Sequence, residues 1–178
     1  KVYRWERAQR GRFREFYQCD IDVIGDGKLD IANEAEIPAI IYQAFTALGL
    51  ERFRIRVNNR KILTGFYAME GLEAQAGDIM RTVDKLDKIG PEKVKALLLE
   101  QGVSEQAAGE ILDFIAITGD NAAVLAALEG YRGRNEIFDQ GLEELATVVK
   151  YLAAFGVPED HFAVDLTIAR GLDYHTGT

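Results

Sequence analysis

The chain has 178 residues, 48% of them hydrophobic, and a net charge of −8. This length allows one domain or a domain with a smaller insert, and the hydrophobic content argues against a disordered chain. The single cysteine, Cys19, excludes an internal disulfide, and together with the two histidines, His161 and His175, it does not make a metal site. No apolar run reaches the roughly 18 residues that span a membrane, and no secretory signal opens the chain. We therefore expect a folded cytoplasmic protein that is not inserted in a membrane.

The charge is distributed unevenly along the chain. Residues 1–15 carry a net charge of +4, so the remaining residues sum to −12. An acidic body disfavours nonspecific binding to nucleic acid, whereas a local positive patch favours a local anionic ligand. An ordinary solvated arginine loop explains the same pattern, and charge alone does not separate the two interpretations.

The first 25 residues predict a β-hairpin. Residues 2–7 and 15–25 have the composition of strands, and a basic loop containing Gly11 separates them. Strand alternation divides the second strand between two faces. The polar face carries Phe16, Gln18, Asp20 and Asp22. The other face is apolar, and we expect it to pack on a core: Tyr17, Cys19, Ile21 and Val23.

The next segment predicts one helix and one strand. Residues 34–48 favour a helix because apolar side chains recur at helical spacing, at Ile37, Ile41, Ala44 and Leu48. Gly49 is a plausible end, and Pro38 leaves the start open because proline suits only the first turn. Residues 52–57 alternate arginines with apolar residues, which predicts a strand with outward-facing arginines before a turn at Asn58-Asn59.

Strand patterns then disappear for some ninety residues, and apolar spacing predicts a block of five helices. We expect Pro91 in the first turn of the second helix, Ser104 as the N-cap of the third and Asp120 before the fourth. Strand alternation returns from Phe162 to Ile168. The fold class is therefore α+β, with an antiparallel β-sheet interrupted by an α-helical insert.

The predicted hairpin also has the properties of a binding site. If its strands are antiparallel, Arg4 shares a surface with Gln18 and Asp22. The planar guanidinium of an arginine can hold a carboxylate or phosphate, and carboxylates can hold an ammonium group. Opposite charges side by side suit a ligand that carries both, such as an amino acid joined to a nucleotide. Polar side chains on a solvated strand edge are the alternative.

Other familiar sites have no support in the sequence. The stretch from Asp22 to Asn33 has the look of a calcium loop, but Ile24 and Asn33 stand where that loop needs an acidic or amide residue and a glutamate. The glycine-rich phosphate-binding motifs, the GxSxG motif and the HExxH motif are all absent from the sequence.

Two strings resemble one family of enzymes. "YRWERAQRGRFREFYQCDID" is similar to the second signature motif of class II aminoacyl-tRNA synthetases, in its histidyl-tRNA synthetase version. "ARGLDYHTGT" is similar to the histidine-specific motif of the same family. "DKLDKIG" resembles the start of that family's helical insertion, and "VNNRKIL" matches a family stretch more loosely. Residues 91–160 match only in helical character.

The resemblance implies roles for residues that would bind ATP. Arg4 stands where the family's arginine binds the α-phosphate of ATP and the histidine carboxylate, and Glu6 where the family contacts the adenine. Arg12 and Arg14 lie in the loop that the family uses for the outer phosphates and the tRNA acceptor end. Arg170 matches an arginine particular to this family, which acts on the α-phosphate. Arg4 and Arg170 are thus the expected catalytic residues.

The resemblance also implies a pocket for histidine. Gln18 and Asp22 match positions that hold the substrate's α-amino group, although the bacterial form often has glutamate at the second. Tyr174 matches a tyrosine of the histidine pocket. His175 departs from the family's usual second tyrosine, and a histidine there would make the pocket sensitive to pH near neutrality.

The family implies a whole reaction and an architecture. Its members form histidyl-adenylate from histidine and ATP, with Mg²⁺ expected alongside ATP, and transfer the histidine to the acceptor stem of tRNA(His). By this resemblance residues 1–67 and 156–178 belong to a class II catalytic core with an antiparallel sheet, residues 68–155 form the helical insertion, and the full-length enzyme is a homodimer. We expect a piece of a longer polypeptide that is inactive alone. A non-catalytic relative, either a regulatory subunit of histidine biosynthesis or an RNA-binding domain appended to a kinase, is the alternative.

Overall fold

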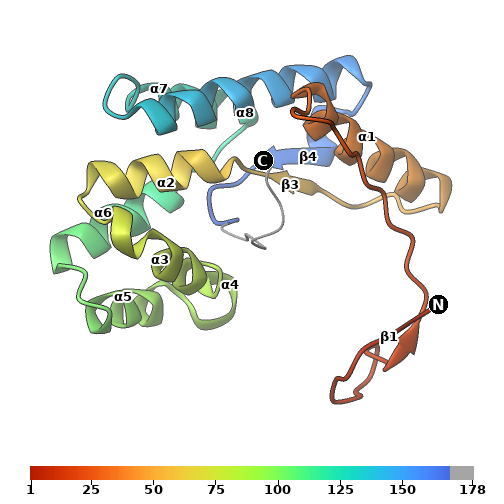
Figure 1. Cartoon of the computed structure of the whole chain (residues 1–178), viewed down its shortest axis with the longest axis horizontal. Helices are drawn as coiled ribbons and strands as arrows, with labels where there is room; N and C mark the ends of the chain where they lie inside the picture. Colours follow the sequence, from red (N-terminus) through yellow and green to blue (C-terminus); the bar gives the residue numbers. More distant parts are fainter. Residues whose placement is uncertain (169–178) are drawn as a thin grey trace.

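The computed structural model describes residues 1–168 and has an α+β fold in which helices pack around one small sheet, while a second small sheet forms a hairpin that extends away from them (Figure 1). Within this range no helix has the length and apolar character needed to cross a membrane. The helices, in chain order, are α1 (Ala32–Ala47), α2 (Arg60–Met69), η1 (Glu73–Gln75), α3 (Ala76–Val83), α4 (Leu86–Ile89), α5 (Pro91–Glu100), α6 (Glu105–Ile115), α7 (Asn121–Glu129), α8 (Glu136–Ala154) and η2 (Glu159–His161).

The two sheets each contain two strands. β1 (Val2–Tyr3) pairs antiparallel with β2 (Glu15–Phe16), as predicted. β3 (Ile55–Val57) pairs with β4 (Phe162–Val164) in parallel, so the expectation of an antiparallel sheet is wrong for this pair. The helices between β3 and β4 return the chain to the end of the sheet at which β3 begins, which is the connection that parallel strands require.

The apolar face of the hairpin does not pack on a core among the described residues. Tyr17 is 79% exposed, Ile21 is 45% exposed and Val23 is 39% exposed, and Cys19 is exposed as well. The expectation of burial is wrong here because the hairpin extends away from the helices, and no described element covers that face (Figure 1). The strands are also shorter than predicted, since only two residues on each side pair.

The main core lies among the helices. Phe66 of α2 stacks on Phe114 of α6 with ring centroids 3.9 Å apart, and Phe138 of α8 contacts Phe114 edge-to-face. Val164, the last residue of β4, and Leu166, two residues after it, belong to the same buried cluster. The return strand is therefore fixed by the helical core as well as by its pairing with β3. Asn121 adds a further link, because its buried Oδ1 accepts a hydrogen bond from the backbone N–H of Val164 at 2.8 Å.

Helix α1 packs through a different face from the predicted one. Ala35 and Ala39 are its buried residues, and they contact α8 in a second core cluster. Leu48, predicted to face a core, is 77% exposed. Pro38 lies well inside the helix, although proline normally ends or kinks a helix. The buried alanines on either side of Pro38 hold both halves of α1 on α8 and offset the missing backbone hydrogen bond.

The predicted helix starts in the second half of the chain are confirmed. Pro91 is in the first turn of α5, and the side chains of Ser104 and Asp120 cap α6 and α7. Helix α2 was not predicted, because Asn58-Asn59 resembled an isolated turn. Asn59 is in fact the N-cap of α2, and its side chain accepts a hydrogen bond from the backbone of Lys61. Ile79, Val83 and Leu86 have the spacing of one helix, the first of the predicted block, but the structure divides them between α3 and α4.

Candidate functional site

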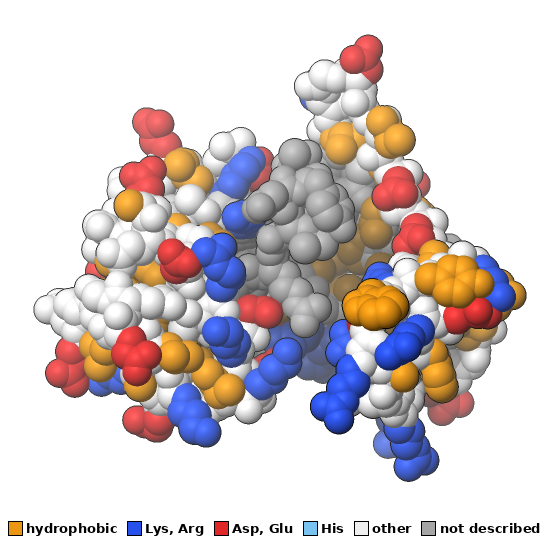
Figure 2. Space-filling view, turned by 60° about the horizontal axis from the view of Figure 1, so that its bottom comes forward, with side chains coloured by type: hydrophobic (Ala, Val, Ile, Leu, Met, Phe, Trp, Pro, Cys, Tyr) orange, Lys and Arg blue, Asp and Glu red, His pale blue; other side chains and the backbone are white. Residues whose placement is uncertain are grey.

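The hairpin is closed at its tip by its backbone. The N–H of Arg4 donates to the carbonyl of Arg14 at 2.9 Å, and Gln9 and Arg12 exchange two backbone hydrogen bonds. Gly11 lies between them with a φ of 76°, a conformation that glycine adopts without strain. This turn brings the chain back beside β1, where β2 pairs with it (Figure 1). In Figure 2, Lys and Arg side chains and hydrophobic side chains intermingle on the lobe that comes forward at the right.

One group of polar side chains on the hairpin contains two of the predicted site residues. The guanidinium of Arg4 donates from Nη2 to Oε1 of Gln18 at 3.3 Å, and its carbon lies 5.2 Å from the ring centroid of Phe16. Nε2 of Gln18 donates to Oδ1 of Asp20 at 3.4 Å. Arg4 and Gln18 are therefore brought together as predicted. Asp20, which was predicted on the same polar face but given no role, joins them through Gln18.

A second group contains three further predicted site residues of the hairpin: Glu6, Arg12 and Arg14. Arg12 forms an ion pair with Glu6, and Nε of Arg14 donates to the backbone carbonyl of Glu6 at 2.9 Å. The guanidinium carbon of Arg14 also lies 5.5 Å from the ring centroid of Trp5, which is 97% exposed. Glu6 therefore holds both loop arginines close to the first strand. The aromatic ring of Trp5 remains open to solvent.

The other predicted site residues are not brought into these groups. Asp22 is exposed, and it forms no hydrogen bond or ion pair within residues 1–168. Arg170, Tyr174 and His175 lie outside the described residues, so their predicted roles stay predictions.

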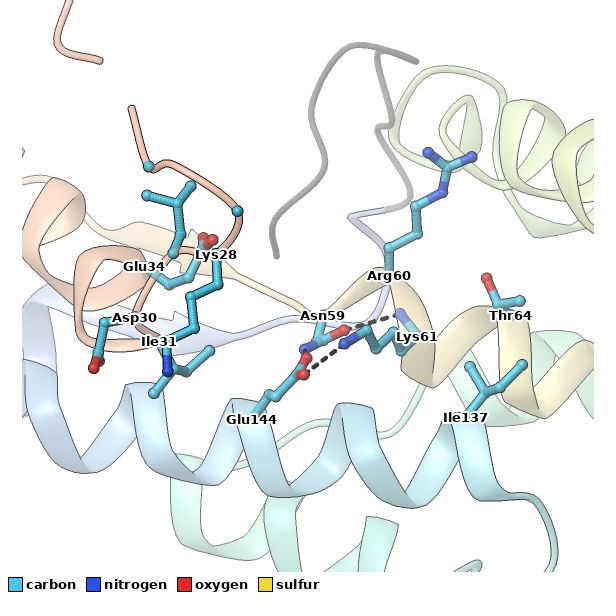
Figure 3. A pocket seen from close by; sticks show the side chains of 13 residues that line it. Lys28, Asp30, Ile31, Glu34, Asn59, Arg60, Lys61, Thr64, Ile137 and Glu144 are labelled. Atoms are coloured by element: carbon cyan, nitrogen blue, oxygen red, sulfur yellow. Dashed lines mark hydrogen bonds and ion pairs between the residues drawn. The ribbon is translucent and has the colours of Figure 1, made fainter. Parts of the chain in front are cut away.

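A second polar centre lines a cavity of about 710 Å³ next to α1, α2 and α8 (Figure 3). Buried Asn59 donates from Nδ2 to Oε2 of Glu144 at 2.8 Å, and Nζ of Lys61 lies 2.5 Å from Oε1 of the same carboxylate. Arg60 points away from Glu144 in Figure 3. No sequence pattern indicated this centre, although an asparagine immediately before a helical pattern is an N-cap signal. Its polar groups satisfy one another, so it joins α2 to α8.

The carboxylate of Glu144 makes this junction dependent on pH. Burial opposes ionisation, but the hydrogen bonds from Lys61 and Asn59 outweigh it and lower the pKa of Glu144 below its ordinary value of 4.5. A lowered folded-state pKa means that the ion pair contributes stability above pH 4.5, and that this contribution is lost as the pH falls through the folded-state value.

We predict that Glu144→Gln lowers the free energy of unfolding at pH 7 by about 1 kcal/mol, since the junction is partly exposed. The difference from wild type should shrink as the pH falls below 4.5, which urea unfolding at several pH values would measure. Glu143→Gln is the matched control, because the side chain of Glu143 is 74% exposed and lies 3.8 Å from Arg132. An equal loss in both variants, or a loss independent of pH, would contradict the assignment.

Comparison with known proteins decides the family. A family model described as histidyl-tRNA synthetase matches residues 1–178. The chain belongs to the histidyl-tRNA synthetase family. A histidine–tRNA ligase of Clostridium tetani (strain Massachusetts / E88) is 50% identical over 178 residues, covering 100% of this chain and 40% of that protein. A histidine–tRNA ligase of Xanthomonas axonopodis pv. citri (strain 306) is 45% identical over 188 residues, covering 100% of this chain and 39% of that protein.

A solved structure agrees with this membership. The crystal structure of histidyl-tRNA synthetase from Nostoc sp. PCC 7120 superposes with a TM-score of 0.81 at 40% identity, over 84% of this chain and 36% of that one. The fold of the chain is thus similar to part of a histidyl-tRNA synthetase. The chain spans about 40% of the length of the curated relatives it matches.

Proposed function

We propose that this chain forms part of the catalytic domain of a histidine–tRNA ligase, which activates histidine with ATP and transfers it to tRNA(His). The observation that carries the proposal is the pairing of Arg4 with Gln18 on a hairpin whose loop arginines are held by Glu6. The guanidinium of Arg4 suits a phosphate or carboxylate, and the amide of Gln18 beside it suits the polar groups of an amino acid. The pair therefore suits a ligand that joins an amino acid to a nucleotide. Membership of the histidyl-tRNA synthetase family supports the same reaction.

The proposed first step joins histidine to AMP. A carboxylate oxygen of histidine attacks the α-phosphorus of ATP, the bond from that phosphorus to the bridging oxygen breaks, and pyrophosphate leaves with the bond's electrons. Arg4 would neutralise charge on the α-phosphate and orient the carboxylate, and Arg170 would approach the same phosphate from the other segment. Asp22, which is exposed, would bind the α-ammonium group of histidine with Gln18. Positioning and charge stabilisation account for such catalysis.

The loop arginines suit the outer part of the ligand. Arg12 lies at the hairpin tip and Arg14 just before β2, where they would meet the β- and γ-phosphates or the acceptor end of tRNA(His), and Glu6 would face the adenine. ATP would enter as its Mg²⁺ complex, for which we name no protein ligand. Tyr174 and His175 would line the pocket for the imidazole of histidine. The full-length enzyme would be a homodimer.

The proposed domain organisation follows the family. Residues 1–67 and 156–178 would belong to the class II core sheet, and residues 68–155 to a helical insertion. Because α2 continues to Met69, a boundary after this residue keeps the helix intact. The insertion would then share its hydrophobic core with α2 and with the end of β4.

The test is amino-acid-dependent exchange of pyrophosphate into ATP by the full-length polypeptide that contains residues 1–178. We expect exchange with histidine and at most background exchange with the other amino acids. The 178-residue chain alone should not aminoacylate tRNA(His). Histidine binding without exchange in the full-length polypeptide would overturn the proposal and assign a non-catalytic role, and robust exchange by the chain alone would refute the expected inactivity.

A further inference from the structure

Arg56 of β3 connects three segments that are far apart in the sequence. Its Nε lies 2.6 Å from Oδ2 of Asp165, and its Nη2 lies 2.6 Å from the hydroxyl of Thr167. Its Nη1 lies 3.2 Å from Oδ2 of Asp87 in α4. One planar guanidinium therefore fixes the turn after β4 and a helix of the helical block at the same time. Such multidentate contacts impose geometry that a single ion pair does not.

The turn after β4 is held at both of its ends. The backbone N–H of Asp165 donates to the carbonyl of Val57 at 3.0 Å, and the side chain of Asn58 donates to the carbonyl of Ile168 at 2.9 Å. Within the turn, Oδ1 of Asp165 accepts from the N–H of Thr167 at 2.9 Å and from its hydroxyl at 2.6 Å. The end of β3 and the first residues after it thus determine where the chain lies at Ile168, two residues before Arg170.

The charge state of the turn is set by the same contacts. Burial opposes ionisation of Asp165, but hydrogen bonds from Thr167 and Arg56 outweigh it and lower the pKa of this carboxyl group. The pKa of Arg56 is raised, chiefly by its hydrogen bond to Asp165. The partners therefore remain charged at neutral pH. A small cavity of about 330 Å³ lies beside them, lined by Arg56, Thr167 and residues of α4 and the segment before it.

We propose that Arg56 and Asn58 are positioning residues for activation, which fix the point from which the chain continues from β4 toward Arg170. Because Asp87 of α4 also contacts Arg56, the position of the turn after β4 depends on the position of α4. The helical block is thereby coupled to the segment that contains Arg170. This inference rests on the proposed function, because it takes Arg170 as a group that acts on the α-phosphate. Neither Arg56 nor Asn58 touches the substrate in this scheme. Their effect passes through the turn that they hold.

Strand β3 supplies its own control. Arg54 lies on the same face, two residues before Arg56, and its Nε donates to the carbonyl of Asp160 at 3.3 Å. It therefore contacts the chain before β4, whereas Arg56 contacts the chain after it. Replacing either arginine removes one positive charge from an exposed surface, but only the replacement of Arg56 removes contacts with the turn at Asp165 and Thr167.

Two measurements test the proposal. In the full-length polypeptide, Arg56→Ala should lower kcat for histidine-dependent exchange by about 10- to 100-fold, with a smaller change in KM, because small misplacements of reacting groups are costly. Arg54→Ala should stay close to wild type, and Asp87→Asn should give an intermediate loss. Arg56→Lys should recover little, because an ammonium group cannot reproduce the planar contacts. Unchanged kcat in Arg56→Ala would overturn the proposal.

The second measurement does not depend on activity. In the 178-residue chain, Arg56→Ala should speed amide hydrogen exchange at Thr167 and Ile168, while exchange in α6 and α8 remains as in wild type. Unchanged exchange at the turn would overturn the proposal, and so would equally faster exchange throughout the chain, because that would indicate a general loss of stability. If the wild-type polypeptide lacks histidine-dependent activity, the proposed function fails while this measurement still decides whether Arg56 holds the turn.

Discussion

Replacing Arg4 by alanine in the full-length polypeptide should lower histidine-dependent ATP–pyrophosphate exchange by about 100- to 1000-fold, the usual effect of removing one group that stabilises developing charge. The side chain of Arg4 is exposed, and it contacts only Gln18 and the ring of Phe16 among the described residues. Its removal should therefore leave the fold intact. The loss should appear in the activation step, since the α-phosphate would lose a cation and Gln18 would lose the donor that orients it.

The hairpin offers a matched control for Arg4. Arg10 lies in the basic loop of the same hairpin, is exposed, and has no assigned role in the proposed site. Arg10→Ala removes the same charge from the same hairpin, so a general electrostatic effect on ATP binding would appear in both variants. We expect exchange by Arg10→Ala to stay within about threefold of wild type, as for surface positions away from special features. Equal losses in the two variants would contradict a specific role for Arg4.

Local signals explain which elements the sequence could predict. The starts of α5, α6 and α7 were predicted because proline in the first turn, serine and aspartate each act on backbone groups within a few residues. The same chemistry operates at Asn59, but the pair Asn58-Asn59 is also a common turn sequence. Only the packing of Ile62 and Phe66 on the rest of the core shows that a helix follows.

Tertiary contacts explain what the sequence could not predict. The pairing of β3 with β4 is parallel because of the path of the helices between them, and alternation within each strand is the same for either direction. Alternation also predicted an apolar face for the second strand of the hairpin, but it could not show whether another element covers that face, and none of the described elements does. Likewise Ala35 and Ala39, rather than the predicted Ile37, Ile41, Ala44 and Leu48, are the buried residues of α1 in its cluster with α8, since small residues allow close approach.

The candidate site likewise includes one contact that local patterns predict and others that depend on distant segments. Arg4 and Gln18 were predicted to share a surface because antiparallel pairing and alternation fix that geometry, and the structure joins them. Arg56 was expected to face outward as one of three solvated arginines. Its contacts with Asp87 and Asp165 depend on segments 31 and 109 residues away, so no local pattern could have indicated them.

The close packing of α2 on α8 gives the second large expected effect. A Cβ atom added at Gly65 of α2 would lie 2.5 Å from the backbone nitrogen of Phe138 and 2.7 Å from its Cα. At Gly141 of α8, an added Cβ would lie 2.8 Å from the backbone nitrogen of Ile62. Backbone atoms cannot move aside as a flexible side chain does. The two glycines therefore set the distance between the helices from both sides.

Gly65→Ala should accordingly lower the free energy of unfolding by about 3 kcal/mol, at the upper end for overpacking in a well-packed core. Gly109→Ala in α6 is the control, because its added Cβ would meet nothing within 4 Å, and it should stabilise the chain by about 0.5–1 kcal/mol through helix propensity. Urea unfolding of the 178-residue chain measures both. An unfolding midpoint in Gly65→Ala equal to that of wild type would contradict the close approach. Because Asn59 and Glu144 join the same two helices, separating them should also weaken that hydrogen bond, so combining Gly65→Ala with Glu144→Gln should cost less than the sum of the two single changes.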